Sequence, residues 1–414
     1  MSRLSEEKKT ELWMRLECKI ERMLTQLNDK SPHATVEGIY DSTRLDWWTS
    51  GFWPGMLWIM YSRTGKNCYL ERAWDFDIRL EQKLGEDNNF HHDVGFQFLP
   101  TAVIKYKLTG DADARRRGLH AANLLAGRFN LAGQFIRAWN PVKDKTVWNA
   151  GNTGWAIIDS AMNLALLLWA AEELDDPRFR HIAQAHADTI LEHFIRPDGS
   201  VRHICSFDPE SGAFLASIGG QGFGPDSAWS RGAAWALHGL AVVYRYTRVP
   251  RYLDAAKQIA HFFLAATEND AVPVWDFRAI PAESSRITDA DSTLESGTDN
   301  RVFNPLSAHK VGRDAVAKVP RDTSAAACAA SGLLELAVLV PFAEQDLYYR
   351  QAERILMSLS ERYASWDEPS YEGILREATG NLPAGSNINV SLIYGDYFFL
   401  EAAAKLTSWD YRIF

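Results

Sequence analysis

Two kinds of helix-length segment alternate along most of this 414-residue chain. In the first kind nearly every position is apolar, as in residues 154–170, which read GWAIIDSAMNLALLLWA. In the second kind apolar residues recur every three or four positions among polar ones, as in residues 177–194 (PRFRHIAQAHADTILEHF). An all-apolar helix is buried on every side, whereas an amphipathic helix covers a core with one face. The alternation therefore predicts inner helices, each followed by an outer helix.

The inner–outer unit recurs, which predicts a closed ring of helices. Five complete units and one further inner segment begin at Ser50, Val94, Asp159, Ser230, Asp322 and Gly395. The amphipathic residues 6–27 supply the outer partner of the last inner segment. Because the unit length varies, an open solenoid with a fixed period is disfavoured. We therefore expect an all-α fold, a single (α/α)6 toroid over residues 1–414 made of six helical hairpins, with its active site at the N-terminal face of the inner helices.

Three linkers between the units differ from ordinary short turns. Residues 201–209 and 272–280 carry β-type and turn residues, which predicts short hairpins. Residues 218–227 (IGGQGFGPDS) lack the ending of a phosphate-binding loop, so we expect an irregular loop where the backbone approaches a ligand. Residues 284–313 form a long polar linker, which the sequence leaves open as a surface loop or an active-site lid.

The composition excludes several classes of partner. The formal net charge of −9 argues against nucleic acid and anionic membranes as partners. The charged N-terminus does not resemble a secretory signal, and no apolar run has the length of a membrane span. The four cysteines are scattered without a C-x-x-C pair, which is typical of reduced thiols. We expect a cytoplasmic protein with no membrane partner.

Residues that could act in catalysis or binding gather at the N-terminal ends of the predicted inner helices, which are called heads below. The carboxylates Asp93 and Asp159 lie at consecutive heads, and Arg231 follows at the next. Tryptophans at or near the heads are Trp47, Trp48, Trp53, Trp229 and Trp235. Aromatic faces suit sugar rings, guanidinium groups bind carboxylates in a bidentate manner, and carboxyl groups transfer protons. This combination favours a pocket for an acidic sugar.

The carboxylates also have structural interpretations. Aspartate is among the preferred N-cap residues, so Asp159 could cap its helix or act in catalysis, and the residues alone leave both open. Asp322 and Asp396 are interpreted as caps or supporting groups. The triplet His91–Asp93 suggests a metal site, but we expect the consecutive histidines to point in different directions, and no third ligand follows at helical spacing. We predict no metal and no cofactor.

Several motifs resemble one known family. HHDVGF at residues 91–96, AIIDSAMNL at 156–164 and WSRGAAWALHG at 229–239 are similar to glycoside hydrolase family 88, the unsaturated glucuronyl hydrolases. Further motifs follow in the same order between about residues 46 and 406. The resemblance implies that Asp159 is the catalytic acid/base and Asp93 the second essential carboxylate. It implies substrate contacts at Trp48, Trp139, His203, Gln221, Arg231 and Trp235. Residues 217–220, 284–313 and 385–390 depart from the family pattern, which leaves the leaving sugar open.

The resemblance also implies a reaction. The substrate is a small unsaturated oligosaccharide, and Asp159 protonates C4 of its C4=C5 double bond before water adds at C5. Asp93 is expected to raise the pKa of Asp159 through its negative charge. Three alternatives stay open: a hydrolase for unsaturated rhamnogalacturonan, a sugar epimerase using histidines such as His203 and His238, and a non-catalytic carbohydrate-binding protein.

Overall fold

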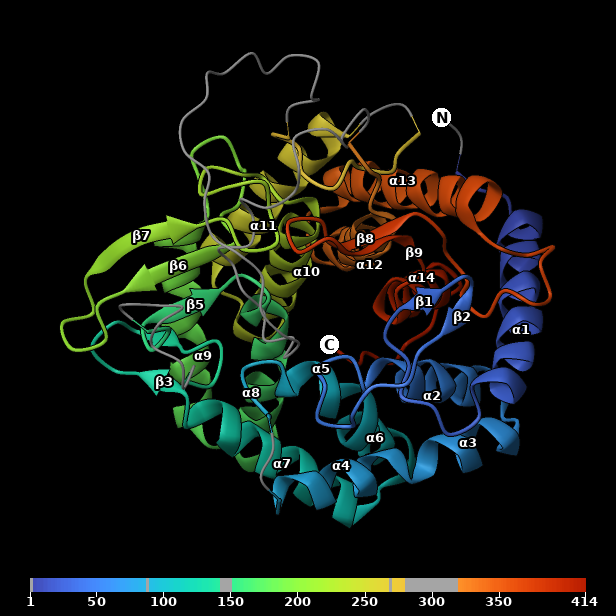
Figure 1. The fold of residues 1–414 in the computed structure, drawn as a ribbon, viewed down its shortest axis with the longest axis horizontal. Helices are drawn as coiled ribbons and strands as arrows, with labels where there is room; N and C mark the ends of the chain where they lie inside the picture. The colour runs from blue at the N-terminus through green and yellow to red at the C-terminus, as the bar shows by residue number, and fades with distance from the viewer. Residues whose placement is uncertain (1–2, 87–88, 142–150, 268–269, 280–318) are drawn as a thin grey trace, which may run out of the picture.

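A computed structural model describes residues 3–86, 89–141, 151–267, 270–279 and 319–414. Within these residues, inner helices pack side by side in a closed ring (Figure 1), because each contacts the next and the last contacts the first. In ring order they are α2 (Phe52–Thr64), α5 (Val94–Phe98) with η1 (Leu99–Val103) and α6 (Ile104–Thr109), α8 (Ser160–Leu174), α10 (Ser230–Thr247), α12 (Thr323–Leu339) and α14 (Ile393–Leu406).

Outer helices surround the ring, and each packs on the inner helix that its sequence unit predicts, except that α4 packs on η1 of the next unit. They are α1 (Glu6–Leu27), α3 (Asn67–Trp74), α4 (Phe76–Leu84), α7 (Ala112–Ala126), α9 (Pro177–Thr189), α11 (Pro250–Ala266) and α13 (Phe342–Ser358). Helix α1 covers α14, so the two ends of the chain complete one hairpin (Figure 1). The predicted (α/α)6 toroid is confirmed.

Burial explains why the two helix types occupy different layers. Every residue of α8 from Ser160 to Ala171 is buried, whereas α1 buries a stripe at Leu12, Leu16, Ile20 and Met23. Such a stripe lets one face of an outer helix cover the ring while the other faces water. One core cluster takes in residues from both layers. That residues 1–414 form one domain stays a prediction.

Two helices depart from the regular plan. The first outer segment is split at Asp75 into α3 and α4. The second inner helix changes to a π-helical turn, η1, which contains Pro100. Proline has no N–H to donate, so the regular hydrogen-bond ladder is interrupted at this residue. Both departures leave the ring order unchanged.

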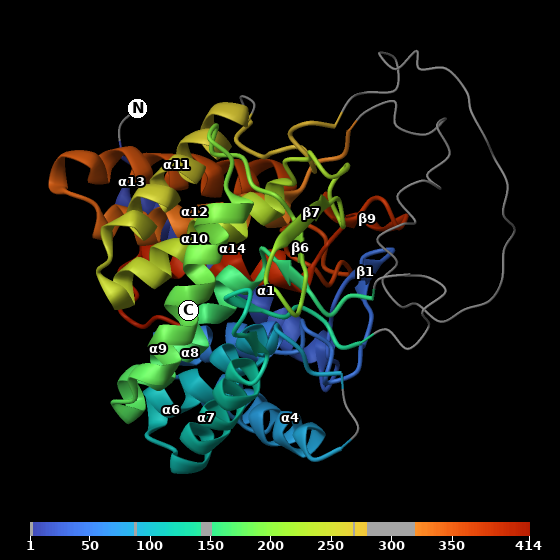
Figure 2. The same cartoon turned by 90° about the vertical axis from the view of Figure 1, so that its left-hand side faces the viewer.

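Short strands gather on one side of the ring (Figure 2). The largest sheet is antiparallel, with β5 (Trp155–Ile157), β6 (Ile204–Phe207) and β7 (Phe214–Ile218) in that order. Among the described residues there are also three hairpins: β1 (Thr35–Val36) with β2 (Ile39–Tyr40), β3 (Phe129–Asn130) with β4 (Phe135–Ile136), and β8 (Ala378–Asn381) with β9 (Ser386–Val390).

The linker predictions have mixed outcomes. The hairpin expected near residues 201–209 is confirmed by β6 and β7. The hairpin expected at 272–280 is wrong for the described part, 272–279, which makes only isolated bridges, Trp229 to Asp276 and Val274 to Arg321. Its partners lie elsewhere in the chain, so a local pattern could not reveal them. The linker 284–313 lies outside the described residues. None of the described helices combines the length and apolarity needed to cross a membrane.

Candidate active site

The N-terminal ends of the inner helices bring the predicted site residues to one face. Asp93 is the N-cap residue of α5 and Asp159 is the N-cap residue of α8. Arg231 is the second residue of α10, and Asp322 is the N-cap residue of α12. Because α5 contacts α8, α8 contacts α10 and α10 contacts α12, these groups occupy consecutive heads of the ring.

Asp159 lies between a strand and a helix. Strand β5 ends two residues before it and α8 begins directly after it. It occupies the N-cap position, yet its side chain accepts no capping hydrogen bond. The residue is 7% exposed, and its Oδ2 atom is buried without a hydrogen-bond partner. Of the two interpretations of the sequence, the structure does not support capping by this side chain.

Burial shifts the pKa of Asp159 toward neutrality. Removal from water disfavours the ionised carboxylate and raises the pKa to about 7, although the positive charge of Arg231 acts in the opposite direction. A carboxyl group with a pKa near 7 can donate and accept a proton under ordinary conditions. Asp159 therefore has the acidity that a group acting first as acid and then as base requires.

Asp93 influences Asp159 differently from the sequence prediction. Its pKa is raised well above the usual range, first by burial and then by the negative charge of Asp159. Both effects favour the protonated form of Asp93. The prediction that its charge raises the pKa of Asp159 is wrong, because burial raises the pKa of Asp159 and the charge of Asp93 does not contribute to that shift.

The tandem histidines beside Asp93 do not point in different directions. The His91 and His92 rings stack with centroids 5.1 Å apart and planes 26° apart, and this part of the prediction is wrong. The His91 Nδ1 atom lies 3.6 Å and the His92 Nδ1 atom 3.3 Å from Asp93 carboxylate oxygens. Burial holds the pKa of both histidines well below the usual range, so both are neutral.

These three residues could offer ligand atoms within 4.8 Å of one another. Imidazole binds a metal in the plane of its ring. Two stacked rings do not direct their nitrogen lone pairs at one point between them, so the arrangement fits a metal poorly. The absence of a metal stays a prediction.

His203 faces Asp159 from the neighbouring strand. The Ile158 N–H donates to the His203 carbonyl oxygen, which holds His203 beside the head of α8. The His203 Nε2 atom lies 3.8 Å from Asp159 Oδ2 and has no hydrogen-bond partner. Burial lowers the pKa of His203 to about 3, so the ring is neutral.

The loop of residues 218–227, called the Gly-rich loop, sets the tautomer of His203. The Gln221 N–H lies 2.8 Å from His203 Nδ1, closer than the Gly219 carbonyl oxygen at 3.1 Å. An N–H group needs an unprotonated acceptor, so the ring hydrogen belongs on Nε2, toward Asp159. Residues 218–227 contain bends and turns but, apart from the last residue of β7, no strand or helix, as expected.

Gly220 makes this close approach possible, and we expect Gly220→Ala to lower kcat by about 10- to 100-fold. Its φ is +58°, and an added Cβ would lie 2.1 Å from His203 Nδ1. The substitution would push the imidazole away from Asp159. Steady-state kinetics should be compared with Gly224→Ala in the same loop, where an added Cβ meets nothing within 4 Å. Equal kcat values for the two variants would contradict the role of this contact.

Arg231 is held by the protein itself. Its Nη1 atom donates to Asp322 Oδ2 and to the Thr379 carbonyl oxygen, both at 2.6 Å. Its Nη2 atom donates to Gln221 Oε1 at 2.8 Å and to the Gly380 carbonyl oxygen at 2.6 Å. Four of the five guanidinium hydrogens therefore serve internal bonds. Arg231 positions Gln221 and the β8 strand, and its bidentate contact with a substrate carboxylate stays a prediction.

The predicted aromatic contacts differ in accessibility. Trp48 is partly exposed and lies 4.9 Å from Tyr394 between ring centroids. Trp139 is partly exposed and meets His92 edge to face at 6.2 Å. Trp235 is fully buried against Phe96, so its ring has no exposed face for a sugar.

Comparison with known proteins decides the family. Residues 19–272, more than half of the chain, match Glycosyl Hydrolase Family 88. An unsaturated glucuronyl hydrolase of Bacillus sp. strain GL1 is 32% identical over 93% of both chains. The chain belongs to glycoside hydrolase family 88. It is therefore an enzyme, a glycoside hydrolase, and the resemblance seen in the sequence motifs is confirmed.

Two further comparisons extend the family assignment. An unsaturated glucuronyl hydrolase of Formosa agariphila is 34% identical over 86% of this chain and 79% of that protein. The crystal structure of the Bacillus sp. GL1 enzyme has a TM-score of 0.83 at 31% identity and covers 97% of both chains. The likeness covers nearly the whole family 88 toroid.

Two other predicted head residues of this family 88 protein support the structure. Asp322 accepts hydrogen bonds from the Ser324 and Ala325 N–H groups, so it caps α12 as predicted. Asp396 accepts from the Ile374 and Leu375 N–H groups and from the Tyr40 hydroxyl. Asp396 thus joins β2 and the segment before β8 to the head of α14.

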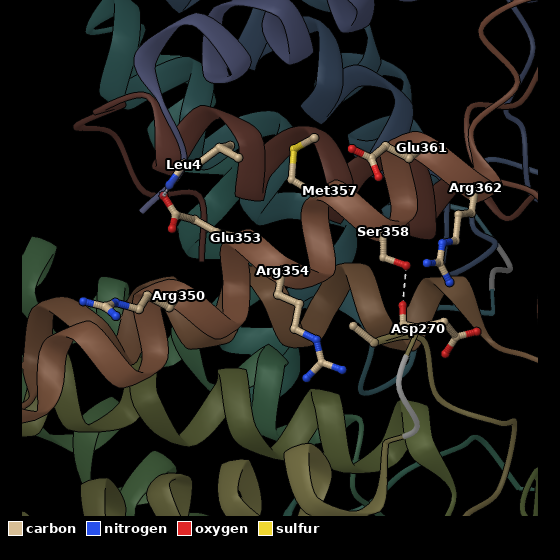
Figure 3. A pocket seen from close by; sticks show the side chains of 10 residues that line it. Leu4, Asp270, Arg350, Glu353, Arg354, Met357, Ser358, Glu361 and Arg362 are labelled. Atoms are coloured by element: carbon tan, nitrogen blue, oxygen red, sulfur yellow. Dashed lines mark hydrogen bonds between the residues drawn. The ribbon is translucent and has the colours of Figure 1, made fainter. Parts of the chain in front are cut away.

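A separate hollow of about 440 Å³ lies on the outer layer (Figure 3). Its lining comes from α13, from η5 (Leu359–Tyr363), from Leu4 and from residues that follow α11. Glu353 accepts the Leu4 N–H, and Ser358 donates to the Asp270 carbonyl oxygen, drawn as a dashed line. No inner-helix residue lines this hollow, so it is not part of the candidate active site.

Sequence reasoning missed one polar residue at the centre of the site. Asn163 lies one turn after Asp159 on α8 and is fully buried. Its side chain contacts the Asp93 carboxyl group, the Asp159 backbone and the Phe96 backbone. The signal was an amide side chain four positions after Asp159, inside a run that is apolar apart from Asp159 and Ser160. Only the packing of α5 against α8 shows what it contacts.

Proposed function

We propose that this chain is an unsaturated glucuronyl hydrolase. It releases 4-deoxy-4,5-unsaturated glucuronic acid from the non-reducing end of small oligosaccharides produced by polysaccharide lyases. The observation that carries the proposal is Asp159, a buried carboxyl group with an unpartnered oxygen and a pKa near 7 at the N-terminal ends of the inner helices. Two relatives at 32% and 34% identity that bear this name support the substrate class.

The proposed chemistry uses one carboxyl group twice. Protonated Asp159 donates its proton to C4 of the C4=C5 double bond, and positive character develops at C5 and the ring oxygen. Water adds at C5 and returns a proton to Asp159, which now acts as a base. The hemiketal that forms opens to a keto acid and releases the neighbouring sugar. Proton balance is restored in each turnover, so no cofactor is required.

The neighbouring groups of Asp159 suit this role. His203 is neutral and directs its Nε2 hydrogen toward Asp159 Oδ2 at 3.8 Å, so it can favour the carboxylate after proton donation. Burial and the charge of Asp159 favour the protonated form of Asp93, which can act as a neutral hydrogen-bond donor, as buried carboxylic acids do in other enzymes. Trp48 and Trp139, both partly exposed, are the aromatic faces available to the sugar ring.

A paired assay tests the function. The purified protein is incubated with a lyase-derived unsaturated disaccharide and with its saturated counterpart. Loss of the alkene ultraviolet absorbance, with no conversion of the saturated sugar, is the expected result. Conversion of the saturated sugar would indicate another enzyme class, and binding without turnover would indicate a carbohydrate-binding protein. A parallel assay with an unsaturated rhamnogalacturonan disaccharide separates the related hydrolase activity from the proposed one.

The epimerase alternative loses its main support. It required histidines acting together, and His203 and His238 lie in different surroundings. His203 contacts Trp229 and the Gly-rich loop, whereas His238 contacts Lys405 and Phe398 inside the ring. His238 therefore belongs to the core, two turns along α10 from the head residue Arg231.

The pH dependence should report Asp159. The group must be protonated to donate, and burial raises its pKa to about 7. We expect kcat/KM to be constant below that pH and to fall about tenfold per pH unit above it, because ionised Asp159 has no proton to give. Initial rates of absorbance loss between pH 5 and pH 9 measure this limb. A descending limb centred near pH 4 would contradict the assignment.

The cytoplasmic location is part of the proposal. Its four cysteines, Cys18, Cys68, Cys205 and Cys328, are all free, and the first two are exposed. Free exposed thiols persist in a reducing compartment. A small oligosaccharide as substrate is consistent with that location.

A further inference from the structure

Asn163 joins the two carboxylate-bearing helix heads. Its Nδ2 atom donates to Asp93 Oδ1 at 3.2 Å and to the Asp159 carbonyl oxygen at 3.1 Å. Its Oδ1 atom accepts the Phe96 N–H at 2.9 Å. One fully buried amide thus contacts Asp93, the turn that carries Asp159, and the first turn of α5.

The backbone is shaped to admit this amide. An added Cβ on Gly95 would lie 2.5 Å from Asn163 Oδ1 and 2.7 Å from its Cα. Only a glycine at this position lets α5 approach α8 closely enough for the three hydrogen bonds. The contact is therefore built from both helices.

The three partners determine the orientation of the amide. A backbone N–H can only donate, so the Asn163 oxygen must face Phe96. A carbonyl oxygen can only accept, so the Asn163 nitrogen must face Asp159 and, beside it, Asp93. In the flipped orientation the Asn163 NH2 group would face the Phe96 N–H, and the Asn163 oxygen would face the Asp159 carbonyl oxygen and Asp93 Oδ1. No hydrogen bond could form in either place. Asn163 therefore always presents N–H to Asp93 Oδ1.

We propose that Asn163 is a positioning residue that holds Asp93 and the head of α8 in one geometry and makes Asp93 Oδ1 an acceptor. This inference rests on the proposed function. Oδ1, which accepts the Asn163 N–H, also faces His92 Nδ1 at 3.3 Å, and Oδ2 faces His91 Nδ1 at 3.6 Å. Asn163 thereby fixes the position of the Asp93 carboxyl group between the two imidazole rings.

The test compares two substitutions of Asn163. One removes the side-chain oxygen that accepts the Phe96 N–H, and the other keeps an oxygen there. Asn163→Ala removes all three hydrogen bonds, and we expect kcat to fall about 30- to 100-fold, with KM changed less than about threefold. Asn163→Asp keeps the acceptor but adds a third carboxyl group beside Asp93 and Asp159. We expect a similar fall in kcat, and an alkaline limb of the pH–rate profile moved to higher pH, because the added negative charge favours protonated Asp159.

Thr101→Val is the matched control. Thr101 is also fully buried on the segment that follows Asp93, and its hydroxyl donates to the Gln97 carbonyl oxygen without contacting either carboxylate. The Thr101→Val variant should be less stable than the parent protein but should keep its kcat per folded molecule. Circular dichroism gives the folded fraction, and Asn163→Asp carries the test if Asn163→Ala does not fold.

Two results are distinguishable. If the parent protein does not convert the unsaturated disaccharide, the proposed function fails. If the parent does convert it and both Asn163 variants keep kcat within threefold with an unmoved alkaline limb, only the positioning role of Asn163 is overturned.

Discussion

Asp159→Asn is expected to lower kcat by about 10³-fold or more and to leave folding and substrate binding largely intact. The amide cannot protonate C4 or accept a proton from water. The Asp159 side chain makes no capping bond, so its replacement removes no hydrogen bond that supports α8. It also removes a buried group that is costly to ionise, so stability at pH 8 should not decrease. Absorbance loss measures turnover, and calorimetric titration with the unsaturated disaccharide measures binding.

Asp396→Asn is a matched control at another inner-helix head. Asp396 is also a buried aspartate, but it accepts two backbone N–H groups and the Tyr40 hydroxyl. This variant should be less stable and yet retain most of its kcat per folded molecule. A near-normal rate for Asp159→Asn would show that the proton comes from another group.

Arg231→Met is expected to lower the free energy of unfolding by about 3–5 kcal/mol. The Arg231 guanidinium is buried, and its removal leaves the fully buried Asp322 carboxylate without its ion pair. It also leaves the Thr379 and Gly380 carbonyl oxygens without these donors. Urea denaturation followed by circular dichroism measures the change.

Two further variants separate charge burial from general damage. Arg231→Met combined with Asp322→Asn should recover much of the loss, because a neutral amide can still accept the capping N–H groups of α12. Arg251→Met removes an exposed ion pair with Asp188 and should cost less than about 1 kcal/mol. If Arg231→Met costs no more than Arg251→Met, the buried pair does not contribute as proposed.

The folded arrangement of the inner heads was predictable because it follows from helix order. Alternating apolar and amphipathic segments place successive heads beside one another once the ring closes. Asp93, Asp159 and Arg231 therefore could be assigned to one face from their positions in the units. The pairing of α1 with α14 followed from the same count, since one inner segment lacked an outer partner.

The contacts within the site were not predictable because they join residues far apart in the chain. The stacking of His91 on His92 depends on the loop before α5, which no helical or strand period describes. Arg231 is engaged by Asp322, Thr379 and Gly380, all more than 90 positions away in the sequence. Because these partners are so distant in the sequence, only the folded structure shows that the Arg231 N–H groups already donate to other parts of the protein. The sequence had suggested a guanidinium free to bind a substrate carboxylate.

The sequence by itself determined the layers of this protein, the order of its helix heads and its membership of a family, because periodicity and local motifs are properties of neighbouring residues. Tertiary structure alone decided the pKa shifts of the carboxyl pair. Burial raises the pKa of Asp159 to about 7 and that of Asp93 well above its usual range, and desolvation depends on everything packed around a group. It also decided the role of Asn163, whose amide meets Asp93 only because Gly95 lets α5 pack closely against α8.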